Sequence, residues 1–164
     1  MSFYPDIILS SLEEINCSFL KENNIQGLII DLDDTLVMHG KSEIPKASQK
    51  LLEMLKSNGF SVVVMSNNTK KRAEPLCKRL DVDFVYSSRK PFLRGYRLAL
   101  KKLNLPAKNI CAIGDQLLSD IVGANRMGFL SVYIPPLTKK GGFTVRVKRI
   151  IERPFVKIIR KIKK

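Results

Sequence analysis

The stretch LIIDLDDTLV, residues 28–37, runs a β-forming segment directly into closely spaced carboxylates. Apolar residues typical of strands lead into Asp31, and Asp33 and Asp34 follow within three positions. Like charges this close raise one another's pKa and resist burial. The stretch therefore indicates either a bound cation or a solvated turn.

Length and composition indicate one globular domain. The chain has 164 residues, of which 45% are hydrophobic, and this size lets a single core bury most of the surface of the unfolded chain. No apolar run reaches the roughly eighteen residues of a membrane span, and the start MSFYPDIILSSLEE lacks the basic region of a secretory signal. We therefore expect a cytoplasmic protein. Cys17, Cys77 and Cys111 lie far apart, which predicts neither a disulfide framework nor a zinc site.

The basic charge is concentrated at the C-terminal end. The formal net charge is +14, and residues 139–164 hold eleven Lys and Arg residues against the single acid Glu152. Apolar side chains recur there every three or four positions, which predicts a basic amphipathic helical tail, kinked or split at Pro154. We divide the chain into a domain at 1–137 and a tail at 138–164. The tail can contact an anionic membrane surface, its own domain or another subunit, and nucleic acid is a less favoured partner.

Strand-like runs alternate with helix-like segments along the domain. Strands are predicted at 28–32, 61–65, 84–86, 110–113 and 131–134, and helices at 45–58, 69–80, 91–103 and 117–127. A capping box from Ser11 to Glu14 predicts a further short amphipathic helix near the N-terminus. This alternation is typical of an α/β fold, a Rossmann-like parallel sheet of about five strands with helices on both faces.

Polar residues follow four of these strands, whose carboxyl ends meet at one edge of a parallel sheet. The four segments are DLDDT at 31–35, SNN at 66–68, SSRKP at 87–91 and GDQLLSD at 114–120. Together they offer carboxylates, a hydroxyl, amides and a lysine, which suit a divalent cation and a phosphate. A cation is therefore the favoured explanation of the clustered aspartates.

The residue types at this edge suggest how phosphate chemistry would proceed. Asp31 and Asp33 lie two apart on an extended segment and point to the same side, so one can attack phosphorus while the other delivers a proton. A hard cation, Mg²⁺ for preference, would reduce the repulsion between the nucleophile and the phosphoryl group. Asp115 can supply a further oxygen ligand for it.

Other side chains are expected to hold the phosphate or to support the site. Ser66, with the N–H groups that follow it from Asn67, and the ammonium of Lys90 would hold the phosphoryl oxygens. Asp120, one helical turn after Asp115, is expected to orient Lys90 or a metal-bound water rather than to bind the metal directly. Thr35 is expected to support the site in the same indirect way.

The order DxDxT, Ser, Lys and GDxxxD resembles the haloacid dehalogenase (HAD) superfamily of aspartyl-phosphate phosphotransferases. The resemblance implies a phosphoaspartate on Asp31, acid and base catalysis by Asp33, and Mg²⁺ held by Asp31, the backbone carbonyl of Asp33 and Asp115. It also implies phosphate contacts from Ser66 and Lys90. The second acid of the first motif favours a phosphatase over a dehalogenase.

The spacing of the motifs resembles the capless subclass IIIA of that superfamily. Only 34 residues separate Asp31 from Ser66, and 23 separate Ser66 from Lys90. The predicted framework fills both intervals, which leaves no room for a cap domain. Water must then be excluded by the substrate or by a neighbouring subunit, which suits a phosphate carried on a large molecule.

Longer segments resemble the YqeG-type branch, which is related to the phosphatidylglycerophosphate phosphatases. They are GLIIDLDDTLV, VVVMSNNTKKR, SSRKPF and AIGDQLLSDIVGANRMGF. This resemblance implies that the chain converts phosphatidylglycerophosphate to phosphatidylglycerol. We expect the substrate to be reached at the inner face of the membrane, with the enzyme attached peripherally through its tail.

Two other functions stay open. The chain could be a capless phosphatase of nucleic-acid ends or of a soluble phosphometabolite, with the tail on nucleic acid, or a non-catalytic binding module. The intact acids disfavour the module, because clustered carboxylates destabilise a metal-free scaffold. Asp34 is expected to make a turn or helix-cap contact, and His39 to be an ordinary loop residue or, alternatively, a substrate contact. Four arginines near the predicted edge could contact a second phosphate or have no role: Arg72, Arg89, Arg94 and Arg126.

Overall fold

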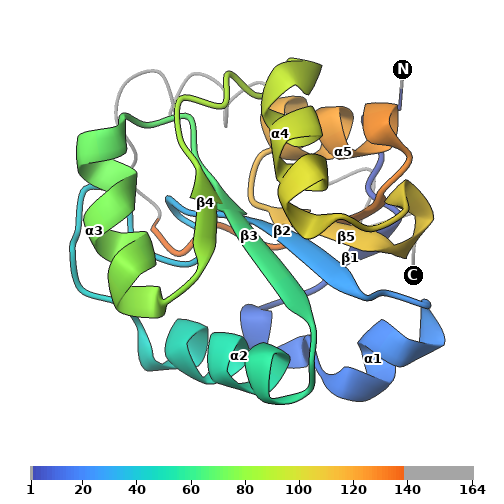
Figure 1. The fold of residues 1–164 in the computed structure, drawn as a ribbon, viewed down its shortest axis with the longest axis horizontal. Coiled ribbons are helices and arrows are strands. Elements are labelled where there is room, and N and C mark those ends of the chain that lie inside the picture. Colours follow the sequence, from blue (N-terminus) through green and yellow to red (C-terminus); the bar gives the residue numbers. More distant parts are fainter. Residues whose placement is uncertain (1, 139–164) are drawn as a thin grey trace.

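The chain folds into a six-stranded parallel β-sheet with helices packed on both faces (Figure 1). The computed structural model describes residues 2–138, so the predicted tail, apart from Thr138, lies outside the described residues. The strands lie in the order β1-β6-β5-β2-β3-β4, and all neighbouring pairs are parallel. Their bounds are β1 Ile7–Ile8, β2 Gly27–Asp31, β3 Ser61–Met65, β4 Asp83–Val85, β5 Ile110–Gly114 and β6 Leu130–Tyr133.

Helices α2, α3 and α4 occupy the intervals predicted for them, whereas α1 lies outside the predicted helices. The α-helices are α1 Cys17–Glu22, α2 Lys46–Ser57, α3 Lys70–Leu80, α4 Leu93–Leu103 and α5 Val122–Met127. Two short 3-10 turns, η1 Leu12–Glu14 and η2 Ala107–Asn109, and a π-helical turn, η3 Leu117–Ile121, complete the described elements. The predicted capping box is present, since the Glu14 carboxylate accepts from the Ser11 N–H at 3.2 Å.

Alternating side chains of the central strand supply both hydrophobic layers. Leu28 and Ile30 of β2 pack in the layer that α1, α2 and α3 cover, whereas Ile29 packs in the layer under α4 and α5. This follows from the two-residue period of a strand. The predicted arrangement of helices on both faces is confirmed.

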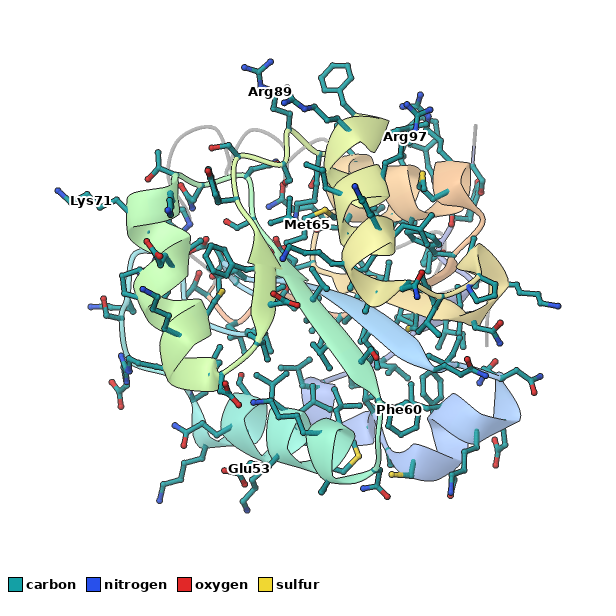
Figure 2. The ribbon with its side chains drawn as sticks, in the orientation of Figure 1. Glu53, Phe60, Met65, Lys71, Arg89 and Arg97 are labelled. Atoms are coloured by element: carbon teal, nitrogen blue, oxygen red, sulfur yellow. The ribbon has the colours of Figure 1, made fainter. Side chains whose placement is uncertain are left out.

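The covering helices are amphipathic. On α2, Leu51, Leu52 and Leu55 are buried against the sheet, whereas Glu53 points away from it (Figure 2). Burial of this apolar stripe, at about 25 cal/mol per Å², holds a short helix that would be marginal alone.

The parallel register brings the carboxyl ends of the strands to one edge. Asp31 at the end of β2 is level with Met65 at the end of β3, and Gly114 at the end of β5 is level with Tyr133. The chain between Asp31 and Ser66 holds α2 and β3 as its regular elements. The framework therefore fills this interval, as expected of a capless chain.

Two local features differ from the predictions. Strand β1 was not predicted; its two residues pair with Val132 and Tyr133 of β6, which raises the sheet from about five strands to six. The helix predicted at 117–127 divides into η3 and α5 because the Ile121 N–H reaches back five residues to the Gln116 carbonyl, at 3.3 Å. Cys77 and Cys111 are buried free thiols, and Cys17 is also free.

Candidate active site

Loops at the carboxyl ends of the strands enclose a cleft of about 200 Å³. They come from the segments after β2, β3, β4 and β5, the four that the sequence singles out. The predicted catalytic and phosphate-binding residues therefore share one cleft. Its lining residues are Asp31, Asp33, Asp34, His39, Ser66, Asn67, Asn68, Lys90, Gln116 and Ser119.

Lys90 links the two acidic segments of the site. Its buried ammonium contacts the Asp31 carboxylate, lies 2.7 Å from Asp120 Oδ1 and donates to the Met65 carbonyl at 3.2 Å. Burial alone would lower the pKa of Lys90, but the carboxylates of Asp120 and Asp31 outweigh it and raise the pKa. Lys90 is therefore a fixed positive charge, and the predicted contact with Asp120 is present.

Three buried carboxylates lie close enough together to hold a metal ion. One carboxylate oxygen from each of Asp31, Asp115 and Asp120 lies within 4.8 Å of the others. Burial raises the pKa of Asp31 to about 7, against the opposing effect of Lys90. The buried Asp31 Oδ2 has no hydrogen-bond partner among the described residues. An all-oxygen donor set with a costly buried charge fits a hard divalent cation such as Mg²⁺.

Gly114 lets Asp120 approach the end of β5. A Cβ at Gly114 would lie 2.4 Å from the carboxyl carbon of Asp120, so any side chain there would displace this acid. Asp120 Oδ2 also accepts from the Gln116 N–H at 3.1 Å, which fixes the carboxylate from the other side. Asp120 thus joins the acidic cluster as well as orienting Lys90, whereas the sequence predicted the second role alone.

Asp33 stands apart from that cluster and faces α3. The Arg72 guanidinium contacts Asp33 Oδ1 at 2.9 Å, and the Asn68 amide donates to Oδ2 at 2.8 Å. Arg72 Nε also donates to Oδ1, at 3.3 Å, so two guanidinium donors hold one oxygen while Asn68 holds the other. The carboxylate is therefore held at the cleft while remaining outside the candidate metal cluster. Sequence reasoning left the role of Arg72 open; its place in the first turn of the helix after SNN puts it at the same edge.

Ser66 and Asn67 order the loops around the cleft. The Ser66 hydroxyl accepts from the Asn68 N–H at 3.0 Å and lies 3.4 Å from Asp33 Oδ2. The Asn67 side-chain oxygen accepts from the Lys90 N–H at 2.7 Å and from the Ser88 hydroxyl at 2.8 Å. The Asn67 side chain thus braces the lysine loop, and the phosphate contact expected of the N–H groups after Ser66 stays a prediction.

Asp34 has the structural role that was expected. It is 1% exposed and adopts a left-handed backbone, with φ 68°. Its carboxylate accepts from the His39 N–H at 3.1 Å and from the Thr138 hydroxyl, and its carbonyl accepts from the Leu137 N–H at 2.9 Å. Asp34 therefore ties the first motif to the last described residues. Thr35 is fully buried, and its hydroxyl makes no hydrogen bond within residues 2–138.

Tyr96 of α4 supports the site without any sequence signal of its own. Its buried hydroxyl donates to the carbonyls of Ser119 and Asp120, both at 2.9 Å. A Cβ at Gly123 would lie 2.2 Å from the Tyr96 ring, so this glycine permits α5 to pack there. Tyr96 thereby fixes the turn that carries Asp120, through contacts that only the tertiary fold creates.

The site holds an aspartate pair at the end of a central parallel strand, and a lysine and a second acid pair face it across the sheet edge. This arrangement defines the phosphatases of the haloacid dehalogenase type. The chain is a phosphoric monoester hydrolase of this class. Within the class it belongs to the family described as mitochondrial PGP phosphatase, whose sequence model matches residues 1–136.

Two similar proteins agree with this assignment. The phosphatase YqeG of Bacillus subtilis is 33% identical over 162 residues, covering 97% of this chain and 92% of that protein. Phosphatidylglycerophosphate phosphatase 1 of the Chlamydomonas reinhardtii chloroplast is 28% identical and covers 93% of this chain. The chain spans only 60% of the length of the Chlamydomonas protein.

Solved structures share the fold at low identity. An uncharacterized protein from Listeria monocytogenes superimposes with a TM-score of 0.59 at 20% identity, over 71% of this chain and 84% of that one. The 3-deoxy-D-manno-octulosonate 8-phosphate phosphatase of Moraxella catarrhalis, solved with magnesium and phosphate ions, gives a TM-score of 0.51 at 20% identity, over 84% and 92%. These likenesses confirm the α/β architecture.

Proposed function

We propose that this enzyme dephosphorylates phosphatidylglycerophosphate to phosphatidylglycerol, with Mg²⁺ as cofactor and a phosphoaspartate on Asp31 as intermediate. The observation that carries the chemistry is the contact of buried Lys90 with both Asp31 and Asp120, beside Asp115. Family membership supports the choice of a lipid phosphomonoester.

In the first half-reaction Asp31 acts as the nucleophile. Asp31 Oδ2, which accepts no hydrogen bond from the described residues, attacks phosphorus as the bond to the leaving oxygen breaks, and Asp33 gives that oxygen its proton. Ser66 and Lys90 hold the phosphoryl oxygens throughout. In the second half-reaction Asp33 takes a proton from water, the water oxygen bonds to phosphorus, and the bond to Asp31 breaks.

Mg²⁺ would be held by Asp31, Asp115 and the Asp33 carbonyl, with Asp120 close by. Its contribution is to offset the repulsion between carboxylate and phosphate. Lys90 supplies part of the same charge, and its contacts with Asp31 and Asp120 orient it before substrate arrives.

The substrate is reached from the cytoplasmic face of the membrane in this proposal. Among residues 2–138, no helix is long and apolar enough to cross a bilayer. We assign attachment to the segment at 138–164 on account of its basic charge, which would bind anionic lipid peripherally. An oligomeric neighbour could add to the closure of a site without a cap.

The test measures phosphate release from phosphatidylglycerophosphate in mixed micelles and from p-nitrophenyl phosphate, each with and without Mg²⁺. We expect Asp31→Asn to lose at least a thousandfold in kcat on both substrates, whereas the matched surface change Asp81→Asn leaves kcat unaltered. A strong preference of the wild type for the lipid is the expected result. Cleavage of the soluble ester alone would overturn the lipid assignment, and RNA or DNA with a phosphorylated end would then be the next substrate to assay.

A further inference from the structure

A second groove, larger than the catalytic cleft, lies between the edge strand β4 and α4. Its volume is about 590 Å³, within the range of 300 to about 1,000 Å³ that is usual for ligand sites. Its lining combines apolar side chains with exposed cations, and we call the cationic part its rim. The six that matter are Phe84, Tyr86 and Leu98 on the apolar side, and Arg89, Arg94 and Lys101 on the basic side.

Large apolar side chains are exposed along the segment that supplies the groove, and two of them, Tyr86 and Leu98, line it. Phe92 is 67% exposed, Leu98 47% and Tyr86 44%. These three come from one short segment. The rest of the described chain exposes only four other large hydrophobic side chains, so the exposed apolar residues are concentrated here. Single exposed apolar residues need no explanation, but a cluster beside a groove marks an interaction surface.

The cations at the rim are available for a ligand. Arg89, Arg94 and Lys101 are exposed and form no ion pair with another residue in the range 2–138, whereas the neighbouring Lys102 pairs with Asp83 at 3.0 Å. Figure 2 shows Arg89 pointing outward beside the first turn of α4. The rim therefore offers positive charge to an anion.

The groove lies on the other side of the lysine loop from the cleft. Ser87 and Ser88 line the groove, and Lys90 lines the cleft. Three residues of extended chain span at most about 10 Å, so a ligand in the groove would lie within a short distance of the bound phosphoryl group. The Ser88 hydroxyl donates to Asn67, another residue of the cleft, at 2.8 Å.

We propose that this groove binds an anionic phospholipid at the membrane surface, with acyl chain on Phe84 and Leu98 and headgroup anion on Arg89, Arg94 and Lys101. The inference rests on the proposed function, because a lipid phosphate in the cleft would place the rest of the lipid, or its neighbour in the bilayer, at this rim. Mixed apolar and cationic chemistry suits an anionic interface. The groove would orient the cleft toward the bilayer independently of residues 139–164.

The chain contains no tryptophan, so a single tryptophan can report on the groove in the full-length protein. Leu98→Trp places the reporter in the groove, and Lys50→Trp places a matched reporter on the exposed face of α2. Each protein is mixed with vesicles of phosphatidylglycerol and phosphatidylcholine in equal parts, or of phosphatidylcholine alone. Emission wavelength, quenching by lipids brominated on the acyl chain, and sedimentation with the vesicles are recorded.

We expect Leu98→Trp emission to shift to shorter wavelength and to be quenched several-fold on phosphatidylglycerol vesicles only, while Lys50→Trp changes in neither respect. In the Leu98→Trp background, Arg89→Gln/Arg94→Gln/Lys101→Gln should remove most of the shift. The control triple change of unpaired exposed cations, Lys21→Gln/Lys50→Gln/Lys108→Gln, should retain it. Tyr86→Trp, at another residue that lines the groove, serves as a second reporter if Leu98→Trp does not fold.

Unchanged emission from both groove reporters while the protein sediments with vesicles would overturn the proposal. A change in emission on adding a single-stranded oligonucleotide in place of vesicles would also overturn it, because the groove would then bind nucleic acid. A change in emission with protein concentration alone would assign the groove to a second copy of the chain. If phosphatidylglycerophosphate is cleaved while the reporters stay silent, the proposed function stands and the groove assignment fails. Quenching on phosphatidylglycerol vesicles without cleavage of phosphatidylglycerophosphate would instead support the groove as a lipid site and overturn the proposed substrate.

Discussion

At the scale of single residues, Arg72 is the side chain that most directly controls Asp33. Its guanidinium contacts the carboxylate at 2.9 Å and both groups are largely buried, with side-chain exposures of 20% and 11%. Water and salt therefore screen this pair less than a surface pair. In the proposed reaction Asp33 moves a proton, so its orientation relative to the leaving oxygen is critical.

Arg72→Gln should lower kcat on p-nitrophenyl phosphate by about tenfold to a hundredfold with a much smaller change in KM, because misplacing a catalytic group by about 1 Å can cost about 10² in rate. Arg79→Gln, on the same helix, removes an arginine that donates to the Ser42 carbonyl outside the cleft, and it should leave kcat within twofold. Steady-state kinetics and circular dichroism of both variants check this. Equal losses in the two variants would show that Arg72 acts on the fold rather than on Asp33.

The positions of the motif residues at the sheet edge could be predicted, whereas the residues that contact and support them could not. Asp31, Ser66 and Lys90 each follow a strand, and the parallel sheet alone brings strand ends together. Arg72 meets Asp33 across 39 residues of chain, and no periodicity or spacing encodes that contact. Asn67 was predicted for the right loop, but the direction of its side chain depends on the lysine loop against which it packs.

At the scale of elements, the π-helical turn η3 is the part of the site whose shape is least usual. It carries Asp120, and the Tyr96 hydroxyl of α4 donates to two of its carbonyls. Since the hydroxyl is buried, its removal leaves two acceptors without this donor.

Tyr96→Phe should therefore destabilise the protein by about 1–3 kcal/mol and lower kcat more than it raises KM, because the turn would no longer fix Asp120 against Lys90. Urea unfolding at constant m-value and steady-state kinetics measure the two effects. Tyr86→Phe removes an exposed hydroxyl and is the control. Loss of stability with full kcat would mean that η3 keeps its shape without Tyr96.

The elements that sequence reasoning placed well are those with strong local patterns. Helix α2 has a buried leucine stripe between Pro45 and Asn58, and β3 matches its predicted bounds. Strand β1 holds two residues, too few to show alternation, and it exists because β6 offers it an edge. The η3 turn is closed by the bond from the Ile121 N–H to the Gln116 carbonyl, and the helical pattern of the sequence does not distinguish that bond from an ordinary α-helical one.

At the scale of the whole molecule, the buried acids make stability depend on pH and on metal. Burial raises the pKa of Asp31 from 3.8 to about 7. The unfolded chain loses this proton near pH 4 and the folded protein near pH 7, so between these values the unfolded state binds fewer protons and stability falls as pH rises. Above about pH 7 the contribution of this group stays constant.

The metal-free protein should accordingly have a lower Tm at pH 7.5 than at pH 5 through this group. Asp31→Asn, which cannot ionise, should show a smaller difference, and saturating Mg²⁺ should remove most of it in the wild type. Differential scanning calorimetry with EDTA or Mg²⁺ over this range checks the expectation. An equally steep decline in Asp31→Asn would assign the pH dependence to other groups.

The contact of Lys90 with two acids also sets a charge count for the pocket. When ionised, Asp31, Asp115 and Asp120 carry three negative charges against the one positive charge of Lys90, which leaves an excess equal to the charge of one divalent cation. A phosphate ester approaching the unneutralised pocket would be repelled, and a monovalent cation would leave half of that excess in place. In the proposed mechanism, electroneutrality therefore favours an ordered sequence, with the cation entering first and the phosphate ester second.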